Sequence, residues 1–172
     1  MFLNESYFRG ELSLPNVKLS NPRAGVGSIL QTVGELDLLF FIEKYEYNFL
    51  VHILGIELTE QMISNKGDNG KFDALINKIF VQREHGSYSP AANYVYVMVM
   101  LNGRSQTSST GEVRKRTDNM SVVSDRNKIV RAWNEMGEMI GNIHLFIRNS
   151  GEYGTIENSC IGWFKAINQF DI

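Results

Sequence analysis

The residues best suited to acid–base or metal chemistry are few in this chain and lie far apart. Its three histidines, His52, His85 and His144, stand alone, with no H-E-x-x-H motif and no carboxylate four residues away. Because a metal site needs several ligands at one point, this spacing predicts no metal site. His52 falls beside the apolar face of a predicted helix, and we interpret it as a hydrogen-bonded core histidine.

Carboxylate pairs and nucleotide-binding motifs are equally poor candidates for catalysis. Glu35 and Asp37 are two residues apart, which on a helix separates them by about 200° around the axis, so they cannot flank one glycosidic bond. The sequence contains no G-x-S-x-G motif and no P-loop, and Gly25-Val26-Gly27 is too short a match to indicate nucleotide binding. We therefore predict no catalytic residue, no cofactor and no enzymatic activity. An enzyme would instead require a pocket with converging carboxylates.

Length and composition are those of an ordinary soluble globular protein. The chain has 172 residues, 43% hydrophobic and 21% charged, which predicts one domain over 1–172 with a substantial core. The one cysteine, Cys160, excludes an internal disulfide framework, fits a reducing compartment and is interpreted as an inert buried thiol. Neither a signal peptide nor a stretch approaching the ~20 apolar residues of a membrane span is visible, so we expect no membrane contact.

The charge of the chain is unevenly distributed. A formal net charge of −2 argues against general nucleic-acid binding through a basic surface. Between Arg104 and Arg131, however, there are seven Arg or Lys residues and three acids, a local net charge of +4 that leaves −6 for the remainder. This stretch is either a solvated loop and helix start, or a basic arm that meets an acidic surface on a neighbouring subunit.

A long amphipathic helix is the clearest element of the sequence. It is expected over about 124–147, where large apolar residues recur at alternating steps of three and four: Ile129, Trp133, Met136, Ile140, Ile143 and Ile147. Gly137 and Gly141 lie four residues apart off this stripe, and each weakens a helix by about 1 kcal/mol relative to alanine. They are either tolerated weak points or places where another segment approaches closely.

Helices are also expected through much of 32–101, so the predicted fold is mainly α, a small helical bundle. The first of these helices is expected to begin near Thr32, which forms a T-x-x-E capping box with Glu35, and to stop at Gly55. The shorter helices that follow are expected at 57–64 and 72–80.

The apolar run 94–100 fits two structures. Its three valines alternate as they would in a strand, whereas Ser89 is a suitable N-cap and Pro90 suits the first position of a helix. We predict a buried helix.

Two segments lack the pattern of a core element. The polar stretch 103–120 offers only Val113 and Met120 for burial, which predicts a protruding arm or β-hairpin. An isolated hairpin is marginal in water, so an ordered arm needs another surface, in a small protein most simply a partner chain. The N-terminal segment 1–25 is expected to be extended, with a short strand at 7–14 that packs on its own core or joins a neighbouring subunit.

The C-terminal segment 152–172 returns to apolar residues. Trp163 and Phe164 are adjacent, and large aromatic side chains either complete a core or form a docking surface for another chain. We favour the core for this pair.

Four segments of the sequence resemble one family of structural proteins. They are, in chain order, Phe41-Ile42-Glu43-Lys44-Tyr45-Glu46, Ser89-Pro90-Ala91-Ala92-Asn93-Tyr94-Val95-Tyr96, Thr110-Gly111-Glu112-Val113 and Val130-Arg131-Ala132-Trp133-Asn134-Glu135-Met136. In this order and spacing they are similar to signatures of the head-to-tail connector (adaptor or ring) proteins of tailed bacteriophages, above all those of phages of Bacteroidota, including the crAss-like phages. The likeness covers roughly 5–136 and is weaker afterwards, where Asp171 stands at a position expected to be glycine.

This resemblance implies a structural virion protein. Such proteins form rings, commonly of twelve copies, that dock on the portal and continue the DNA channel toward the tail. The implied partners are copies of this chain, the portal protein, further connector or tail proteins, and DNA that passes without sequence-specific contact. The implied location is the neck of the virion, assembled in the host cytoplasm.

The resemblance also suggests roles for individual residues. Tyr45, Tyr94 and Trp133 are expected to hold the core. The arm is expected to reach a neighbouring subunit or the portal through Thr110, Gly111, Glu112, Val113, Arg114, Lys115 and Arg116.

A small helical DNA-binding regulator is the alternative. It would use the basic region 114–131 and the helix that follows, and it predicts salt-sensitive binding to duplex DNA.

Overall fold

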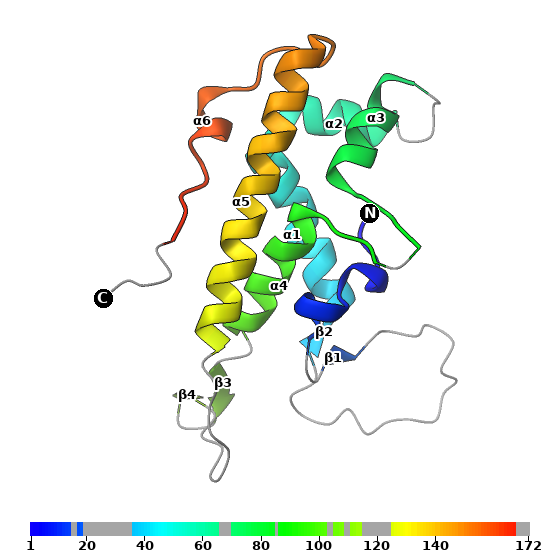
Figure 1. The fold of residues 1–172 in the computed structure, drawn as a ribbon. Coiled ribbons are helices and arrows are strands. Elements are labelled where there is room, and N and C mark those ends of the chain that lie inside the picture. The colour runs from blue at the N-terminus through cyan, green and yellow to red at the C-terminus, as the bar shows by residue number, and fades with distance from the viewer. Residues whose placement is uncertain are drawn as a thin grey trace.

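The long amphipathic pattern forms the longest helix of the structure, α5 (Asp125–Ser150). The fold comes from a computed structural model, which describes residues 1–14, 17–18, 36–65, 70–84, 86–102, 105–108, 111–114 and 125–167. This described part is mainly helical, as the sequence predicts. Helices α1 (Leu38–Leu54), α4 (Pro90–Asn102) and α5 form its centre, with α4 packed against both of the others (Figure 1).

Helix α4 is buried nearly all round, which explains its unusual sequence. Nine of its 13 residues are buried, among them the alternating Val95, Val97 and Val99. A helix enclosed by neighbours needs apolar residues on every side, so it loses the 3.6-residue pattern and looks like a strand. The prediction of a helix is confirmed, and Ser89 caps it, because its Oγ accepts a hydrogen bond from the Ala91 amide (3.2 Å).

Helix α1 begins later than the sequence predicts. Residues Leu36–Asp37 form strand β2, which pairs in parallel with strand β1 (Val17–Lys18). This extended backbone makes the predicted start near Thr32 wrong, and the capping-box residues themselves lie outside the described residues. The end of the helix is as expected: α1 stops at Leu54, and Gly55 follows with a φ of +83°, a conformation that costs glycine little.

Two short helices, α2 (Ile56–Ser64) and α3 (Lys71–Ile79), confirm the predictions for 57–64 and 72–80. They lie at the end of the bundle opposite the hairpin described below (Figure 1). The turn after α5 is tied to α3, because the Tyr153 hydroxyl donates a hydrogen bond to the Lys71 carbonyl (2.7 Å).

The N-terminal segment is not extended. Residues 1–14 contain two 3-10 turns, η1 (Glu5–Tyr7) and η2 (Gly10–Leu12), so the predicted strand at 7–14 is wrong; the rest of 1–25 is described only at 17–18. The first turn forms because the Asn4 side chain accepts a hydrogen bond from the Ser6 amide (2.9 Å). Tyr7 is buried in the chain's own core, which agrees with the intramolecular alternative for this segment.

A buried carboxylate holds the start of the chain against α1. Glu46 is 6% exposed and accepts hydrogen bonds from the amides of Phe2 (2.9 Å) and Leu3 (2.7 Å). The α-ammonium of Met1 lies 3.8 Å from the same carboxylate. These contacts supply the hydrogen bonds that a buried carboxylate needs.

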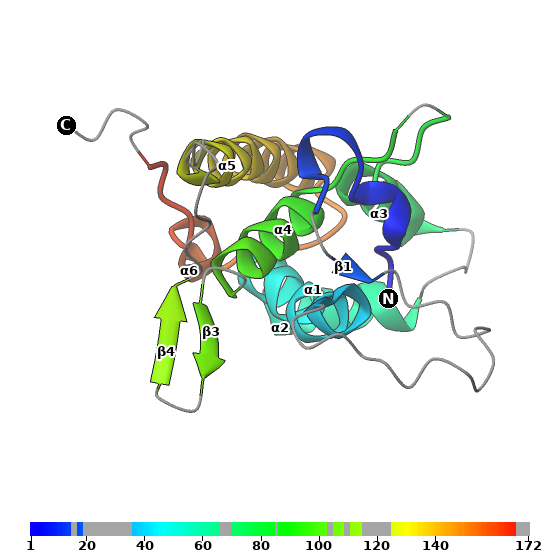
Figure 2. The same cartoon turned by 90° about the horizontal axis from the view of Figure 1, so that it is seen from below.

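The polar arm contains a two-stranded hairpin. Strand β3 (Ser105–Ser108) runs antiparallel to strand β4 (Gly111–Arg114) and pairs with it along its whole length. It lies beyond the ends of α4 and α5 in Figure 1 and to one side of the helices in Figure 2. Of the two alternatives for the arm, a hairpin or a coil, residues 105–108 and 111–114 therefore have the first.

The buried apolar side chains of these elements form one cluster that extends from Leu3 to Tyr153. After α5, the chain forms the short helix α6 (Asn158–Ile161) and then an irregular segment that follows α5 (Figure 1). Within the described residues, no helix combines the length and the apolar character that crossing a membrane requires.

Raising the pH above 10 is expected to destabilise the fold through its buried tyrosines. Burial raises the pKa of Tyr7 and Tyr94 above the ordinary value of 10.0; Gln82 partly offsets the rise at Tyr7, and the Glu46 carboxylate adds to it. The unfolded chain then loses these protons at a lower pH than the folded chain, so the stabilisation is complete below pH 10 and is lost as the pH rises through the folded-state pKa values. Urea denaturation at a series of pH values measures this loss. The Tyr7→Phe variant is expected to lose less stability than the wild type over the same range, and an equal loss would contradict the prediction.

Candidate interaction site

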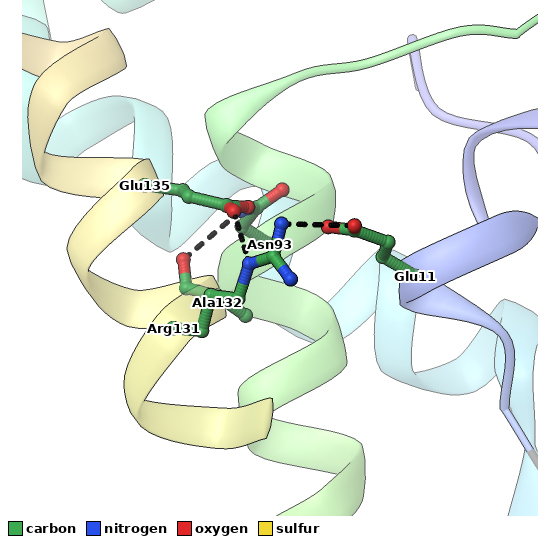
Figure 3. A network of polar contacts seen from close by, with 5 residues as sticks. All are labelled: Glu11, Asn93, Arg131, Ala132 and Glu135. Carbon is green, nitrogen blue, oxygen red and sulfur yellow. Dashed lines mark hydrogen bonds and ion pairs between the residues drawn. The ribbon is translucent and has the colours of Figure 1, made fainter. Parts of the chain in front are cut away.

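Two of the four resembling segments meet at the contact between α4 and α5. The side chain of Asn93, on α4, is 3% exposed and donates a hydrogen bond to the carbonyl of Ala132, on α5 (2.9 Å; Figure 3). A buried amide of this kind fixes the register of two helices, because any slip would leave it without a partner.

An ion-pair network lies on the surface above this contact. Arg131 donates from Nη2 to Glu11 Oε1 (2.9 Å) and from Nε to Glu135 Oε1 (2.9 Å), so it links the turn η2 to α5 (Figure 3). The hydrogen bond to Glu135, with the charges of both carboxylates, raises the pKa of Arg131. Because all three side chains are exposed to solvent, the network orients the N-terminal turns more than it stabilises the fold.

A cleft of about 390 Å³ opens beside this network. Its walls come from the N-terminal turns, the start of α4 and the middle of α5, and they include Arg9, Tyr88, Asn93 and Glu138. The walls mix charged, amide and aromatic side chains, which suits a peptide or protein segment better than a purely apolar ligand.

An aromatic cluster joins α1, α4 and the C-terminal segment. Tyr94 is buried and lies near Tyr45 (ring centroids 6.0 Å apart) and Trp163 (5.7 Å). Tyr45 and Trp133 are half-buried and pack against the core. The expected core residues are thus brought together, with Tyr94 inside the core and the other two at its edge.

The irregular segment 163–167 is held on α5 by hydrogen bonds to its backbone. Trp133 Nε1 donates to the carbonyl of Lys165 (2.9 Å). The side chain of Asn134 both donates to the carbonyl of Ile167 (2.8 Å) and accepts from its amide (2.9 Å), as a neighbouring strand would. The sequence did not reveal this contact; its one signal was Gly137, which lacks a side chain where the Phe164 ring lies.

Replacing Gly137 with alanine is expected to displace the segment 163–167 without unfolding the bundle. A Cβ at residue 137 would lie 2.0 Å from Phe164 Cε1, so the ring, which stacks on Trp133, must leave its place. Faster tryptic cleavage after Lys165 and altered tryptophan fluorescence would report the release. Unchanged cleavage and fluorescence would contradict it.

Gly141→Ala is the matched control for this experiment. Nothing lies within 4 Å of a Cβ built at residue 141, so this glycine is the tolerated weak point that the sequence left open. The substitution is expected to stabilise α5 by about 0.8–1 kcal/mol and to leave tryptic cleavage unchanged.

The histidine expected in the core is the wrong one. His52 is exposed and stacks on Trp163 (ring centroids 4.8 Å apart), whereas His144 is 8% exposed and hydrogen-bonds through Nε2 to the Ile53 carbonyl (2.8 Å). Cys160 is buried, as expected, with its Sγ near the carbonyl of Val51 (3.9 Å). In the part of the chain that the structure describes, no three His, Cys, Asp or Glu side chains are close enough to hold a metal ion.

The expected interface residues are only partly described. Gly111, Glu112, Val113 and Arg114 form β4, whereas Thr110, Lys115 and Arg116 lie outside the described residues. None of the aromatic residues discussed above belongs to this hairpin.

The fold and the site together define a small, mainly helical protein with a projecting hairpin and a polar cleft. No family model matches the sequence, and no curated protein or solved structure is significantly similar to it. Its function is therefore inferred from its own sequence and structure.

Proposed function

We propose that this protein is a structural virion protein that forms a ring in the head-to-tail connector of a tailed bacteriophage. The ring would lie below the portal, link the capsid to the tail and line the DNA channel, with twelve copies as the family resemblance implies. The protein would act without catalysis or a cofactor, through contacts with its own copies, the portal and further connector or tail proteins.

The observation that carries this proposal is the hairpin β3–β4. Among the described elements it has its principal contacts within itself, and the remaining helices do not cover it (Figure 2). A two-stranded hairpin is marginal in water and leaves both strand edges unpaired, so a second molecule is the natural source of the missing contacts.

The positions of the resembling segments support the same proposal. Three of them, on α1, α4 and α5, contribute Tyr45, Tyr94 and Trp133 to one aromatic cluster, while Gly111–Val113 of the remaining segment belongs to the hairpin. This divides the resemblance into a helical body and a projecting contact element. A ring subunit needs this division, because each copy must present two different surfaces to its two neighbours.

Imaging of the particle that contains this chain tests the proposal. We expect a rotationally symmetric ring at the portal vertex, with density for 103–119 crossing to another chain. Absence of this chain from every particle, together with a stable monomer whose arm is ordered alone, would overturn the proposal.

A variant without the hairpin sharpens this test. Replacing 105–114 with a short Gly-Ser linker is expected to abolish incorporation into particles and to leave the helical body folded, as judged by circular dichroism. Incorporation of this variant at the wild-type level would show that the hairpin is not the subunit contact.

The alternative, a DNA-binding regulator, has weaker support. Arg131, one of its basic residues, is already engaged by Glu11 and Glu135 and so is less available for phosphate. Binding to duplex DNA that weakens steeply with salt would favour the regulator, and no binding at low salt would remove it.

A further inference from the structure

The polar cleft offers two opposite charges that no neighbour satisfies. Arg9, beside the turn η2, and Glu138, on α5, both line it and are exposed. Neither makes an ion pair or a side-chain hydrogen bond within the described part of the chain. Their situation differs from that of Glu11 and Glu135, which line the same cleft but are already bound to Arg131.

The hairpin carries the complementary pair of charges. Glu112 and Arg114 are alternate residues of β4, and alternate residues of a strand belong to one face, roughly 6.5–7 Å apart along the strand. Their partners across the hairpin are Thr107 and Ser105, whose small side chains leave the two charges as the dominant feature of that face. An acidic and a basic residue at this spacing match a surface that offers one basic and one acidic residue.

The cleft and the hairpin lie on different sides of the molecule. In Figure 2 the hairpin projects from one side of the helices, whereas η1 and η2, which form one wall of the cleft, lie on the far side. The hairpin therefore does not fill the cleft of its own chain. Two complementary surfaces on different sides of a subunit are the arrangement that joins copies head to tail.

We propose that the cleft between η2, α4 and α5 receives the β3–β4 hairpin of a second copy of this chain, with Glu112 facing Arg9 and Arg114 facing Glu138. This inference rests on the proposed ring and identifies one of its subunit contacts. The cleft is then the acceptor surface, and the hairpin is the element that each copy donates to the next.

Charge reversal tests the pairing. Glu138→Arg and Arg114→Glu are each expected to weaken self-association about tenfold, because each places like charges opposite one another. The double variant Glu138→Arg/Arg114→Glu is expected to recover association close to that of the wild type, and the Arg9→Glu/Glu112→Arg pair tests the second contact in the same way. Sedimentation velocity over a range of protein concentrations measures the association.

The matched control is Glu43→Arg, on α1. Glu43 is exposed, lies outside the cleft and makes no ion pair among the described residues, so its reversal changes the net charge equally but should leave association unchanged. Loss of association in this control, or failure of the double variants to recover, would overturn the proposed pairing.

A disulfide trap tests the geometry and separates this inference from the proposed function. In a Cys160→Ser background, the Arg114→Cys/Glu138→Cys variant is expected to form a ladder of covalent oligomers on oxidation, because each copy carries both halves of the contact. Either single cysteine variant yields dimers at most. No ladder beyond dimers would overturn the inference, while a ring imaged at the portal vertex in that case would leave the proposed function intact.

Discussion

Replacing Glu46 with alanine is expected to lower the free energy of unfolding by about 2–4 kcal/mol. The substitution removes the acceptor of two backbone amides, those of Phe2 and Leu3, and each buried amide left without a partner costs about 1–3 kcal/mol. It also removes the carboxylate that lies near the Met1 ammonium. The N-terminal segment should then detach from α1 before the helices unfold.

Urea denaturation of Glu46→Ala, beside Glu43→Ala and Glu46→Gln, measures this effect. Glu43 belongs to the same helix but is exposed, so its removal should change stability by no more than about 0.5 kcal/mol. Glu46→Gln retains one acceptor oxygen and should fall between the two. Equal stability of Glu46→Ala and Glu43→Ala would show that the buried contacts do not stabilise the fold.

Phe49→Ala is expected to cost about 3–5 kcal/mol, since it removes a large side chain from the middle of the core. Phe49 is fully buried, and its ring lies against Tyr94 (centroids 5.4 Å apart) and Trp163 (6.0 Å). Its loss leaves a cavity at the point where α1, α4 and the C-terminal segment meet. Trp163 should lose part of its protection from solvent.

Thermal unfolding and tryptophan fluorescence of Phe49→Ala report these two effects. The matched control is Phe40→Ala on the same helix, because Phe40 is 55% exposed and its removal opens no cavity. A fall in stability as large in Phe40→Ala as in Phe49→Ala would contradict the packing described for α1.

The helices could be predicted from the sequence because their apolar residues must face one core. The period in 129–147 and the stop at Gly55 are local signals, and both agree with the structure. The start of α1 could not be predicted, because its extended residues Leu36–Asp37 are held by a strand 17 positions earlier at the least. A capping-box pattern contains no information about such a distant partner.

The environment of single side chains was harder to predict than the elements. His52 and His144 both belong to amphipathic helices, and which of them is buried depends on where the chain after α5 returns. That chain places Trp163 over His52, and α1 supplies the carbonyl of Ile53 to His144. Neither contact leaves a local pattern in the sequence.

The candidate site combines predictable and unpredictable parts. The polar composition of 103–120 was enough to predict a projecting arm, and its hairpin agrees with this. The cleft was not predicted, because its walls come from three separate segments, one of which was expected to be extended. Arg9 and Glu138 are unremarkable in the sequence and become candidates only once η2 lies beside α5.

The burial of α4 has a mechanical consequence for the hairpin. Only residues 103–104 separate the end of α4 from the start of β3, and α4 is the helix that its neighbours enclose most completely. Its amide protons should therefore exchange with solvent only when the whole bundle opens. A pull on the hairpin would be transmitted directly to this most protected helix, so the arm is anchored in the part of the molecule that yields last.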